Sequence, residues 1–293
     1  MIILDINQIV MSNLMQHINI AKDENVDENF LRHMILNSIR AYNSKFRQEY
    51  GKLIIADDDG YCWRKDVFPN YKANRKKSRD ASEYDWNIIF GTLEKIKEEI
   101  KEHFPYPYLR MKMCEADDII AVVTKKFHLL EKILIISGDK DFRQLQKNRN
   151  VFQYSPVLKK FLAEEDPARY LKTLILTGDK GDGIPNYLSD DDLFVNKFKK
   201  HRRLSFKRTK IILEAKDVRT VLSDHEYTNW MRNTRLIDFD HIPKNLQEDI
   251  ISMYEVEKFN DHSIGTVYKY LVDNRLKVLL SSIGDFLSNP VLA

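Results

Sequence analysis

Short runs of apolar residues recur along the first half of the chain and end in polar or charged positions. The runs at 1–5, 52–56 and 132–137 are almost continuously apolar, which is typical of strands buried on both faces of a parallel sheet. A further short strand is predicted within "FPYPYLRM" at 104–111. The pattern therefore predicts four strands before residue 140.

The stretches between these runs carry apolar residues at helical spacing. Helices are predicted over about 27–49 and 82–103, and a third begins near Glu115. Strands that alternate with helices imply right-handed crossovers, so the predicted fold class is α/β with a mainly parallel central sheet flanked by helices. After residue 183 the apolar runs shorten and helical patterning dominates. We therefore expect two domains, 1–183 around the sheet and a mainly helical region at 184–293.

Composition narrows the class of protein. With 293 residues, of which 43% are hydrophobic and 11% aromatic, the chain is typical of a globular protein rather than a disordered one. No apolar run approaches the roughly 18 residues of a membrane span, and the N-terminus lacks the charged region of a signal peptide. Two cysteines, Cys62 and Cys114, form neither a disulfide framework nor a zinc pattern. These features predict a soluble cytoplasmic protein that does not bind membranes.

Carboxylates gather where the predicted strands end. Asp5 closes the first run, three aspartates at 57–59 close the second, and Asp139 and Asp141 follow the last run two residues apart. In an open α/β sheet, ligands bind outside the carboxyl ends of the strands, so we expect these side chains to converge on one rim. Further acids lie in "EADD" and "GDKGD", namely Glu115, Asp117, Asp118, Asp179 and Asp182.

A single acid in such a position is often only a helix N-cap or a turn residue, and acids at a helix start also suit the helix dipole. The occurrence of several acids at neighbouring strand ends favours a functional site, because a helix cap needs no second and third carboxylate. Two carboxylates about 4 Å apart repel by about 1 kcal/mol in water and by about 4 kcal/mol at an effective dielectric constant of 20. Either their pKa values rise or divalent cations lie between them, and oxygen ligands without His or Cys favour Mg²⁺ or Mn²⁺ over zinc. Two such cations suit phosphodiester hydrolysis, since one activates water and the other stabilises the departing oxygen.

Two basic segments accompany the acids. The first, 64–79, carries seven Lys or Arg against one acid, with Phe68 and Tyr71 interleaved; the second, 197–210, carries eight and no acid. A charge run is usually a solvated surface, but aromatic side chains stack on bases while Lys and Arg follow phosphates. We therefore expect the first segment to grip a single strand and the second a duplex. Gly, Pro and Asn in "GDGIPNYLSDD" predict a tight turn between helices just before the second segment, as in helix-turn-helix motifs.

The ordered motifs resemble those of a known family. The segments "ILD", "IIADDDGYCWRKDVFPNYKANRKK", "EADDIIA", "ILIISGDKDFRQL" and "LTGDKGDGIPN" closely resemble the bacteriophage 5′-nucleases, a group that includes the ribonuclease H of T-even-type phages within the flap endonuclease superfamily. The resemblance covers most of residues 1–190. It implies a PIN-like 5′-nuclease core with 64–79 as a basic arch and 184–210 as a helix-turn-helix-type duplex-binding motif.

The resemblance also assigns roles to residues. It implies two Mg²⁺ ions, for which Mn²⁺ can substitute, and it matches Lys72 and Arg75 to the "YKxNR" arch residues that grip the 5′ strand and the scissile phosphate. These two residues and Asp139 are the expected catalytic residues. The family usually has one Asp at the second strand exit, and spacing to Trp63 selects Asp58, with Asp57 in reserve. The residues expected to hold or support the first ion are Asp5, Asp58, Glu115, Asp117, Asp118 and Asp139, and those expected to serve the second, partly through water, are Asp141, Asp179 and Asp182. The expected nucleic-acid contacts are Arg64, Lys65, Tyr71, Lys72, Arg75, Lys76, Lys77, Lys199, Lys200, Arg202, Arg203, Lys207 and Arg208.

The activity implied is that of a Mg²⁺-dependent 5′-to-3′ nuclease that removes RNA primers from RNA–DNA duplexes and cuts 5′ flaps during lagging-strand replication. The expected partners are DNA and RNA–DNA duplexes with 5′ ends or flaps, together with a single-stranded DNA-binding protein or a sliding clamp. A monomer is expected, in the cytoplasm of a phage-infected host. Two alternatives stay open, a PIN-type single-strand ribonuclease and a non-catalytic DNA-structure-binding protein on the same fold. The basic arch and the long C-terminal region argue against the first, and the acid at every motif position argues against the second.

Overall fold

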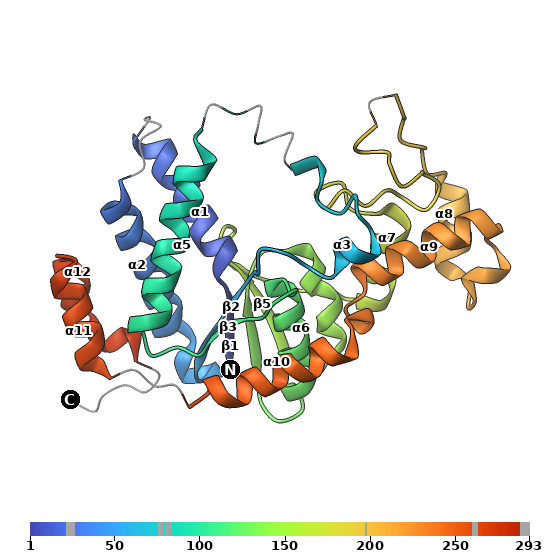
Figure 1. The fold of residues 1–293 in the computed structure, drawn as a ribbon. Helices are drawn as coiled ribbons and strands as arrows, with labels where there is room; N and C mark the ends of the chain where they lie inside the picture. Colours follow the sequence, from blue (N-terminus) through green and yellow to red (C-terminus); the bar gives the residue numbers. More distant parts are fainter. Residues whose placement is uncertain are drawn as a thin grey trace.

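A six-stranded sheet forms the centre of the molecule (Figure 1). The structure is a computed structural model, and it describes residues 1–21, 27–75, 79, 82, 84–196, 198–259 and 263–287. All neighbouring strands pair in parallel except the last two, which are antiparallel. The predicted α/β fold with a mainly parallel sheet is therefore confirmed. The strands are β1 (Ile2–Asp5), β2 (Leu53–Asp57), β3 (Tyr108–Arg110), β4 (Ile133–Ile136), β5 (Val151–Ser155) and β6 (Lys160–Leu162), in the order β3-β2-β1-β4-β5-β6.

The central strands end level with one another. Asp5 pairs with Ala56 of β2, and Leu4 pairs with Ile136 of β4, so the residues that follow all three strands lie along one edge. Every residue of β1, β2 and β4 is buried, which explains why these strands are continuous apolar runs in the sequence. Strands β5 and β6 were not predicted, because polar Gln153 and Ser155 interrupt the apolar pattern of β5 although both are buried.

Helices cover both faces of the sheet (Figure 1). Along β1, Ile2 and Leu4 pack against the helices of one face and Ile3 against those of the other, because successive side chains of a strand point to opposite faces. The helices predicted at 27–49, at 82–103 and near Glu115 are confirmed, whereas the helix that follows Asp5 directly was not predicted. The first face carries α1 (Ile6–Ala21), α2 (Glu28–Tyr50) and α5 (Trp86–His103), and the second carries α6 (Ala116–Phe127) and α10 (Lys244–Glu257).

The C-terminal half is helical, as predicted, but it does not form a core of its own. Val267, Leu271 and Phe286 join the apolar cluster that also contains residues of α2 and α5, and Arg40 of α2 pairs with Asp285 at 2.6 Å. The hydrophobic cores therefore cross the predicted boundary between residues 183 and 184. The remaining elements are α3 (Arg64–Val67), η1 (Lys140–Lys147), α7 (Pro167–Thr177), α8 (Phe206–Glu214), η2 (Val218–Thr220), α9 (Asp224–Ile237), η3 (Phe239–His241), α11 (Ile264–Asp273), α12 (Lys277–Leu280) and η4 (Ile283–Phe286), where η denotes a 3₁₀ helix.

The connection between α7 and α8 differs from the predicted tight turn between helices. A short turn does follow α7, in which the backbones of Asp179 and Ile184 exchange two hydrogen bonds of 2.9 and 2.7 Å. Gly178 enters this turn with φ +66°, and a Cβ there would lie 2.3 Å from the carbonyl oxygen of Ile184, so the turn requires glycine. However, α8 begins only at Phe206, and in the long loop before it the side chain of Asn186 donates a 2.7 Å bond to the carbonyl of Arg202. In the described part of the chain, no helix is long and apolar enough to cross a membrane.

Candidate active site

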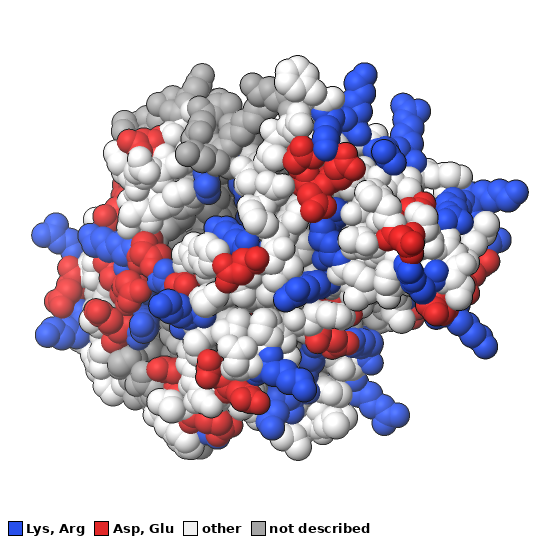
Figure 2. Space-filling view, turned by 45° about the vertical axis from the view of Figure 1, so that its right-hand side comes forward, with Lys and Arg blue, Asp and Glu red and all other residues white. Residues whose placement is uncertain are grey.

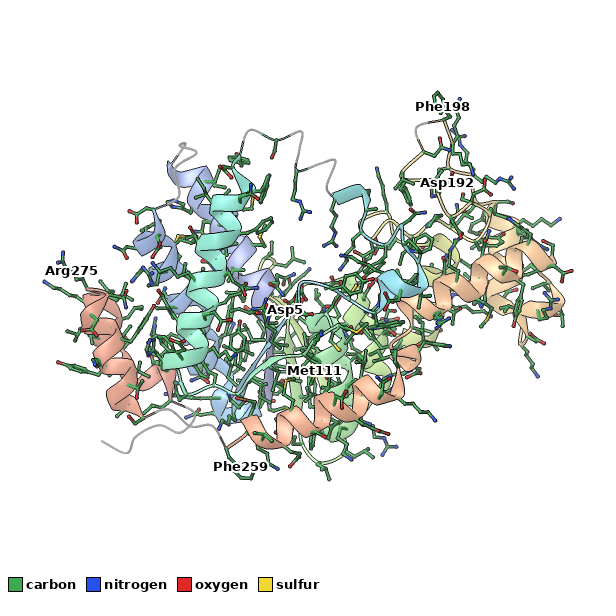
Figure 3. The ribbon with its side chains drawn as sticks, in the orientation of Figure 1. Asp5, Met111, Asp192, Phe198, Phe259 and Arg275 are labelled. Atoms are coloured by element: carbon green, nitrogen blue, oxygen red, sulfur yellow. The ribbon has the colours of Figure 1, made fainter. Side chains whose placement is uncertain are left out.

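Five of the predicted metal ligands meet at the carboxyl edge of the sheet. Asp5 ends β1, Asp58 follows β2, Asp139 follows β4, and Glu115 and Asp117 begin α6. Burial raises the pKa of Asp5 to about 7, with further contributions from the charges of Asp58 and Asp139. Figure 3 shows Asp5 near the centre of the molecule, between the α1–α5 side and the α7–α9 side. We refer to these five residues as the acidic rim.

The start of α6 is tied to the end of β2. The backbone N–H of Glu115 donates to Asp118 Oδ2 at 3.0 Å as part of a capping box, which fixes where the helix begins. The next N–H, of Ala116, donates to Asp58 Oδ1 at 2.7 Å. The capping residues of α6 and the exit of β2 therefore hold their carboxylates in one fixed arrangement.

A second acidic group lies beside the rim. Asp141 of η1 and the turn residues Asp179 and Asp182 are half-buried, and one carboxylate oxygen of each lies within 4.8 Å of the others. This group unites the three residues that were predicted for a second ion. Lys140 Nζ pairs with Asp179 at 2.7 Å and supplies one positive charge to the group.

The carboxylates carry more negative charge than the protein neutralises. Burial, followed by neighbouring acids such as Asp139 for Asp117, raises the pKa values of Asp117 and Asp141, and burial likewise raises that of Asp139. Among the described residues, the buried Oδ1 of Asp141 has no hydrogen-bond partner. An oxygen-only donor set with excess negative charge and free lone pairs fits hard divalent cations such as Mg²⁺ or Mn²⁺.

Lys72 and Arg75 reach into the same region from the basic segment. Lys72 Nζ contacts Glu115 Oε1 and lies 3.7 Å from Asp182 Oδ1, and Arg75 Nη2 donates to Asp182 Oδ1 at 2.6 Å. Burial acts to raise the pKa of Glu115, but Lys72 and Arg64 outweigh it and lower that pKa to about 2. Lys72 has φ +56°, and its N–H donates to the carbonyl of Asp182, which fixes the side chain over the acids. The side chains of Lys72 and Arg75, two of the predicted catalytic residues, thus lie beside the carboxylates.

Three predicted site residues lie in the interior instead. Arg64 is 3% exposed and bonds to Glu115 Oε2 at 3.0 Å, to Asp118 at 2.8 Å and to the carbonyl of Leu236 at 2.8 Å. Asp118 is fully buried and faces this guanidinium, which favours the second of its two predicted roles, support of the first ion rather than direct coordination. Tyr71 is also buried, with its hydroxyl donating to Glu115 and Asp182. We therefore no longer count Arg64 and Tyr71 among the nucleic-acid contacts, because neither presents a surface.

The three aspartates at the end of β2 have separate environments. Asp57 is fully buried and accepts from Lys97 Nζ at 2.6 Å and from the Tyr108 hydroxyl at 2.8 Å. Asp59 accepts from the backbone N–H of Met113. Asp58 alone of the three shares the electrostatic environment of Asp5, so the choice of Asp58 over Asp57 stays the better prediction.

Two clefts reach the rim. A cleft of about 980 Å³ is lined by Asp58, Arg75 and Arg79 together with the rings of Trp86 and Phe90. Another, of about 750 Å³, is lined by residues of α1 and by Asp5, Asp139 and Val157. The carboxylates Asp5, Asp58 and Asp139 therefore line space that is open to a nucleic-acid strand.

The second basic segment forms an exposed surface distant from the rim. Figure 2 shows Lys and Arg side chains projecting from the side of the molecule that holds α8 and α9, and Figure 3 places Phe198 at the tip of the loop before α8. Lys199 pairs with Asp190 at 2.8 Å and Asp192 at 2.6 Å, and Arg208 bonds to Glu226 at 3.2 Å. The predicted contacts Lys200, Arg202, Arg203 and Lys207 are exposed, Lys65 is half-exposed, and Lys76 and Lys77 lie outside the described residues.

Sequence reasoning missed the residues that support the rim. Gln8 accepts a hydrogen bond from the backbone N–H of Gly138, Gln153 donates to the loop after β4, and Lys97 neutralises Asp57. No motif marks these residues. Only the position of Gln153 within an otherwise apolar stretch could have drawn attention to it.

Comparisons with known protein families assign the chain to the 5′-3′ exonucleases. The family described as "5′-3′ exonuclease, N-terminal resolvase-like domain" matches residues 1–174, and "T4 RNase H, C terminal" matches residues 165–286. The ribonuclease H of Enterobacteria phage T4 is 36% identical over 295 residues, which cover 97% of this chain and 95% of that protein. The flap endonuclease Xni of Shewanella pealeana is 28% identical over 183 residues, covering 59% of this chain and 67% of that protein.

Solved structures share the fold. The bacteriophage T5 5′-exonuclease with bound divalent metal ions (zinc) superimposes with a TM-score of 0.58 at 16% identity, covering 94% of this chain and 98% of that one. The T5 flap endonuclease in a complex with DNA and metal ions gives a TM-score of 0.62 at 17% identity, covering 87% and 98%.

Proposed function

Because the chain belongs to the 5′-3′ exonuclease family and is a phosphodiester hydrolase of the 5′-nuclease kind, we propose that it removes RNA primers from RNA–DNA duplexes and cuts 5′ flaps during lagging-strand replication, using divalent cations. The observation that carries this proposal is the meeting of the acidic rim with Lys72 and Arg75 beside two clefts. A replication role is supported by the similarity to the phage T4 ribonuclease H over almost the whole length of both chains.

The acidic rim and the group of Asp141, Asp179 and Asp182 would hold the cations. The features that fit Mg²⁺ are the oxygen donors, the raised pKa values of Asp117, Asp139 and Asp141, and the buried Oδ1 of Asp141, which has no hydrogen-bond partner among the described residues. When bound, such cations lower the pKa of water and offset charge on the departing oxygen. The protein's own contribution is to hold the carboxylates at fixed positions on three strand ends and one helix start.

Lys72 and Arg75 would bind the scissile phosphate. Both are paired with carboxylates here, Lys72 with Glu115 and Arg75 with Asp182. A phosphate that enters the site would replace these carboxylates as the anionic partner of the two side chains. The Arg75 side chain is half exposed and can turn toward the larger cleft without breaking a buried contact. Phosphate binding by these two cations would align the 5′ strand along the rim.

The exposed surface around Lys200, Arg202, Arg203 and Lys207 would bind the duplex. These side chains carry charge without buried contacts, which is the arrangement that tracks a phosphate backbone without reading its sequence. The T5 flap endonuclease, which has the same fold, was solved with DNA and metal ions, and this supports a nucleic-acid substrate here.

A cleavage assay tests the proposal. A 5′-labelled RNA primer on DNA, the equivalent DNA primer, a 5′-flap substrate and a free single-stranded RNA are each incubated with wild type and with Asp139→Asn, in Mg²⁺ or in EDTA. We expect short products from the 5′ end only with wild type in Mg²⁺, and cleavage of the RNA primer and the flap. Binding without cleavage under all conditions would refute the proposal, and cleavage of free single strands alone would favour the PIN-type alternative.

A further inference from the structure

The loop that carries Asp139 and leads into η1, where Asp141 lies, leaves the sheet without regular structure. It runs from the end of β4 through Ser137 and Gly138 to the start of η1. Its backbone groups lie in the buried or half-buried zone below the rim, so they need hydrogen-bond partners. The hydrogen bonds to this loop therefore determine the positions of the Asp139 and Asp141 carboxylates.

Gln153 supplies two of these partners. The register of β4 and β5 sets Gln153 opposite Ile135, just below the loop. Its side-chain Nε2 donates to the carbonyl of Ser137 at 3.0 Å and to the carbonyl of Asp139 at 2.6 Å. Gln153 is fully buried, so water does not compete for these bonds. One amide group therefore joins the carbonyls on both sides of Gly138.

The amide of Gln153 is itself fixed in orientation. Its Oε1 accepts from Gln146 Nε2 at 3.1 Å, and Gln146 also donates to the carbonyl of Leu162 and accepts from the N–H of Glu164 at 2.8 Å. Gln146 belongs to η1, the same element that carries Asp141. The pair of glutamines thus links the loop, the 3₁₀ helix and strand β6.

The opposite side of the loop is held as well. Gly138 N–H donates to the side chain of Gln8, and Asp139 N–H donates to Ser137 Oγ at 3.1 Å. Ser137 Oγ in turn donates to Asp5 Oδ2 at 3.1 Å. With Gln153 on one side and these bonds on the other, the loop has little freedom to shift.

We propose that Gln153 is a positioning residue that sets the spacing of Asp139 and Asp141, so that one carboxylate faces each cation. The inference rests on the proposed metal-dependent function, but it concerns a residue that touches neither the cations nor the substrate. Only an amide meets the geometry, since Glu would place a carboxylate against two carbonyl oxygens and Met would donate nothing.

Mn²⁺ titration followed by electron paramagnetic resonance tests the proposal without substrate. Gln153→Met should weaken Mn²⁺ binding at one or both sites by about 10- to 100-fold, as is typical when a partner that orients metal ligands is lost. Gln144→Met is the matched control. Gln144 is an equally buried glutamine of η1, but it bonds to Ile237 and Phe239 in the C-terminal half. It should lower the melting temperature while leaving Mn²⁺ affinity within about twofold of wild type, because its bonds do not reach the loop.

Equal Mn²⁺ affinity in wild type and Gln153→Met would overturn the proposal, as would equal losses in both glutamine variants. If Gln153→Met does not fold, Gln146→Met leaves both bonds from Gln153 to the loop in place but removes the partner of Gln153 Oε1, together with the bonds to Leu162 and Glu164. It should still weaken Mn²⁺ binding, and an unchanged affinity there would count against the proposal. The two proposals also fail separately. A wild type that binds Mn²⁺ but cleaves no substrate refutes the nuclease function, and the titration still decides the role of Gln153.

Discussion

Replacing Asp5 by Asn should stabilise the metal-free protein. Asp5 is 8% exposed and accepts from Gln8 N–H at 3.2 Å and from Ser137 Oγ at 3.1 Å. Asn can keep the first bond through Oδ1 and donate to the serine oxygen through Nδ2, so the change removes a charge with little loss of contact. What is lost is repulsion from Asp58 and Asp139 and the cost of burying a carboxylate.

The magnitude follows from the raised pKa. The pKa of Asp5 rises from 3.8 to about 7. Since each unit of pKa corresponds to about 1.4 kcal/mol, the ionised Asp5 side chain destabilises the folded state by up to about 4 kcal/mol. Between these pH values the folded state binds more protons than the unfolded state, so the free energy of unfolding falls as pH rises from about 4 to about 7 and is then level. Asp5→Asn removes this slope and should raise the melting temperature at pH 8 in EDTA by several degrees, at about 2–4 °C per kcal/mol.

Thermal unfolding in EDTA and in Mg²⁺ measures the effect, with Asp57→Asn as control. Asp57 also ends a strand, but it neutralises buried Lys97, so its loss should destabilise the protein at every pH. In Mg²⁺ the order of wild type and Asp5→Asn should reverse, because only wild type gains the full binding energy of the cation. If Asp5→Asn lowers the melting temperature in EDTA at pH 8 as Asp57→Asn does, the assignment of Asp5 to an under-neutralised rim is wrong.

Other predictions concern the basic residues. The double change Lys72→Ala and Arg75→Ala should weaken binding of 5′ ends and reduce the slope of log K against log salt by up to about 2, since fewer counterions are released; an unchanged slope would argue against phosphate contact. Alanine at Lys200, Arg202, Arg203 and Lys207 should reduce duplex affinity more than affinity for a free 5′ single strand in filter binding, and equal losses would place the duplex elsewhere. Arg64→Leu should lower the free energy of unfolding in urea by about 3–5 kcal/mol, because Glu115 and Asp118 lose a buried partner; a loss below about 1 kcal/mol would contradict that role.

The sequence predicts the carboxylates of the acidic rim better than the residues that hold them in position. Carboxylates at the ends of continuous apolar runs, such as Asp5 and Asp139, could be placed because parallel strands end at a common edge. Arg64 and Tyr71 were misplaced because a basic segment with aromatic residues gives the same pattern whether a side chain faces solvent or a buried carboxylate. The ion pair that decides the matter, between Arg64 and Asp118, joins residues 54 positions apart.

Elements in which polar and apolar residues alternate irregularly were not predicted, because their polar residues are buried against partners that are distant in the sequence. Strand β5 holds Gln153 and Ser155 in its buried face, where each is satisfied by partners from the loop and the hairpin rather than by water. A residue-by-residue reading treats such positions as solvent-facing. The long loop before α8 was likewise read as a tight turn, since the bond from Asn186 to the carbonyl of Arg202 that shapes it has no local signature.

The packing of α11 to η4 on α2 and α5 has a consequence for synthesis on the ribosome. The rim and the strands of the sheet lie within the first 162 residues, yet the apolar cluster that contains residues of α2 and α5 is completed only by Val267, Leu271 and Phe286. At roughly 5–20 residues per second, about 5 to 20 seconds separate the emergence of the two parts. Throughout that interval the apolar side chains of this cluster on α2 and α5 lack their C-terminal partners, and exposed apolar surface of this kind favours aggregation until the last helices cover it.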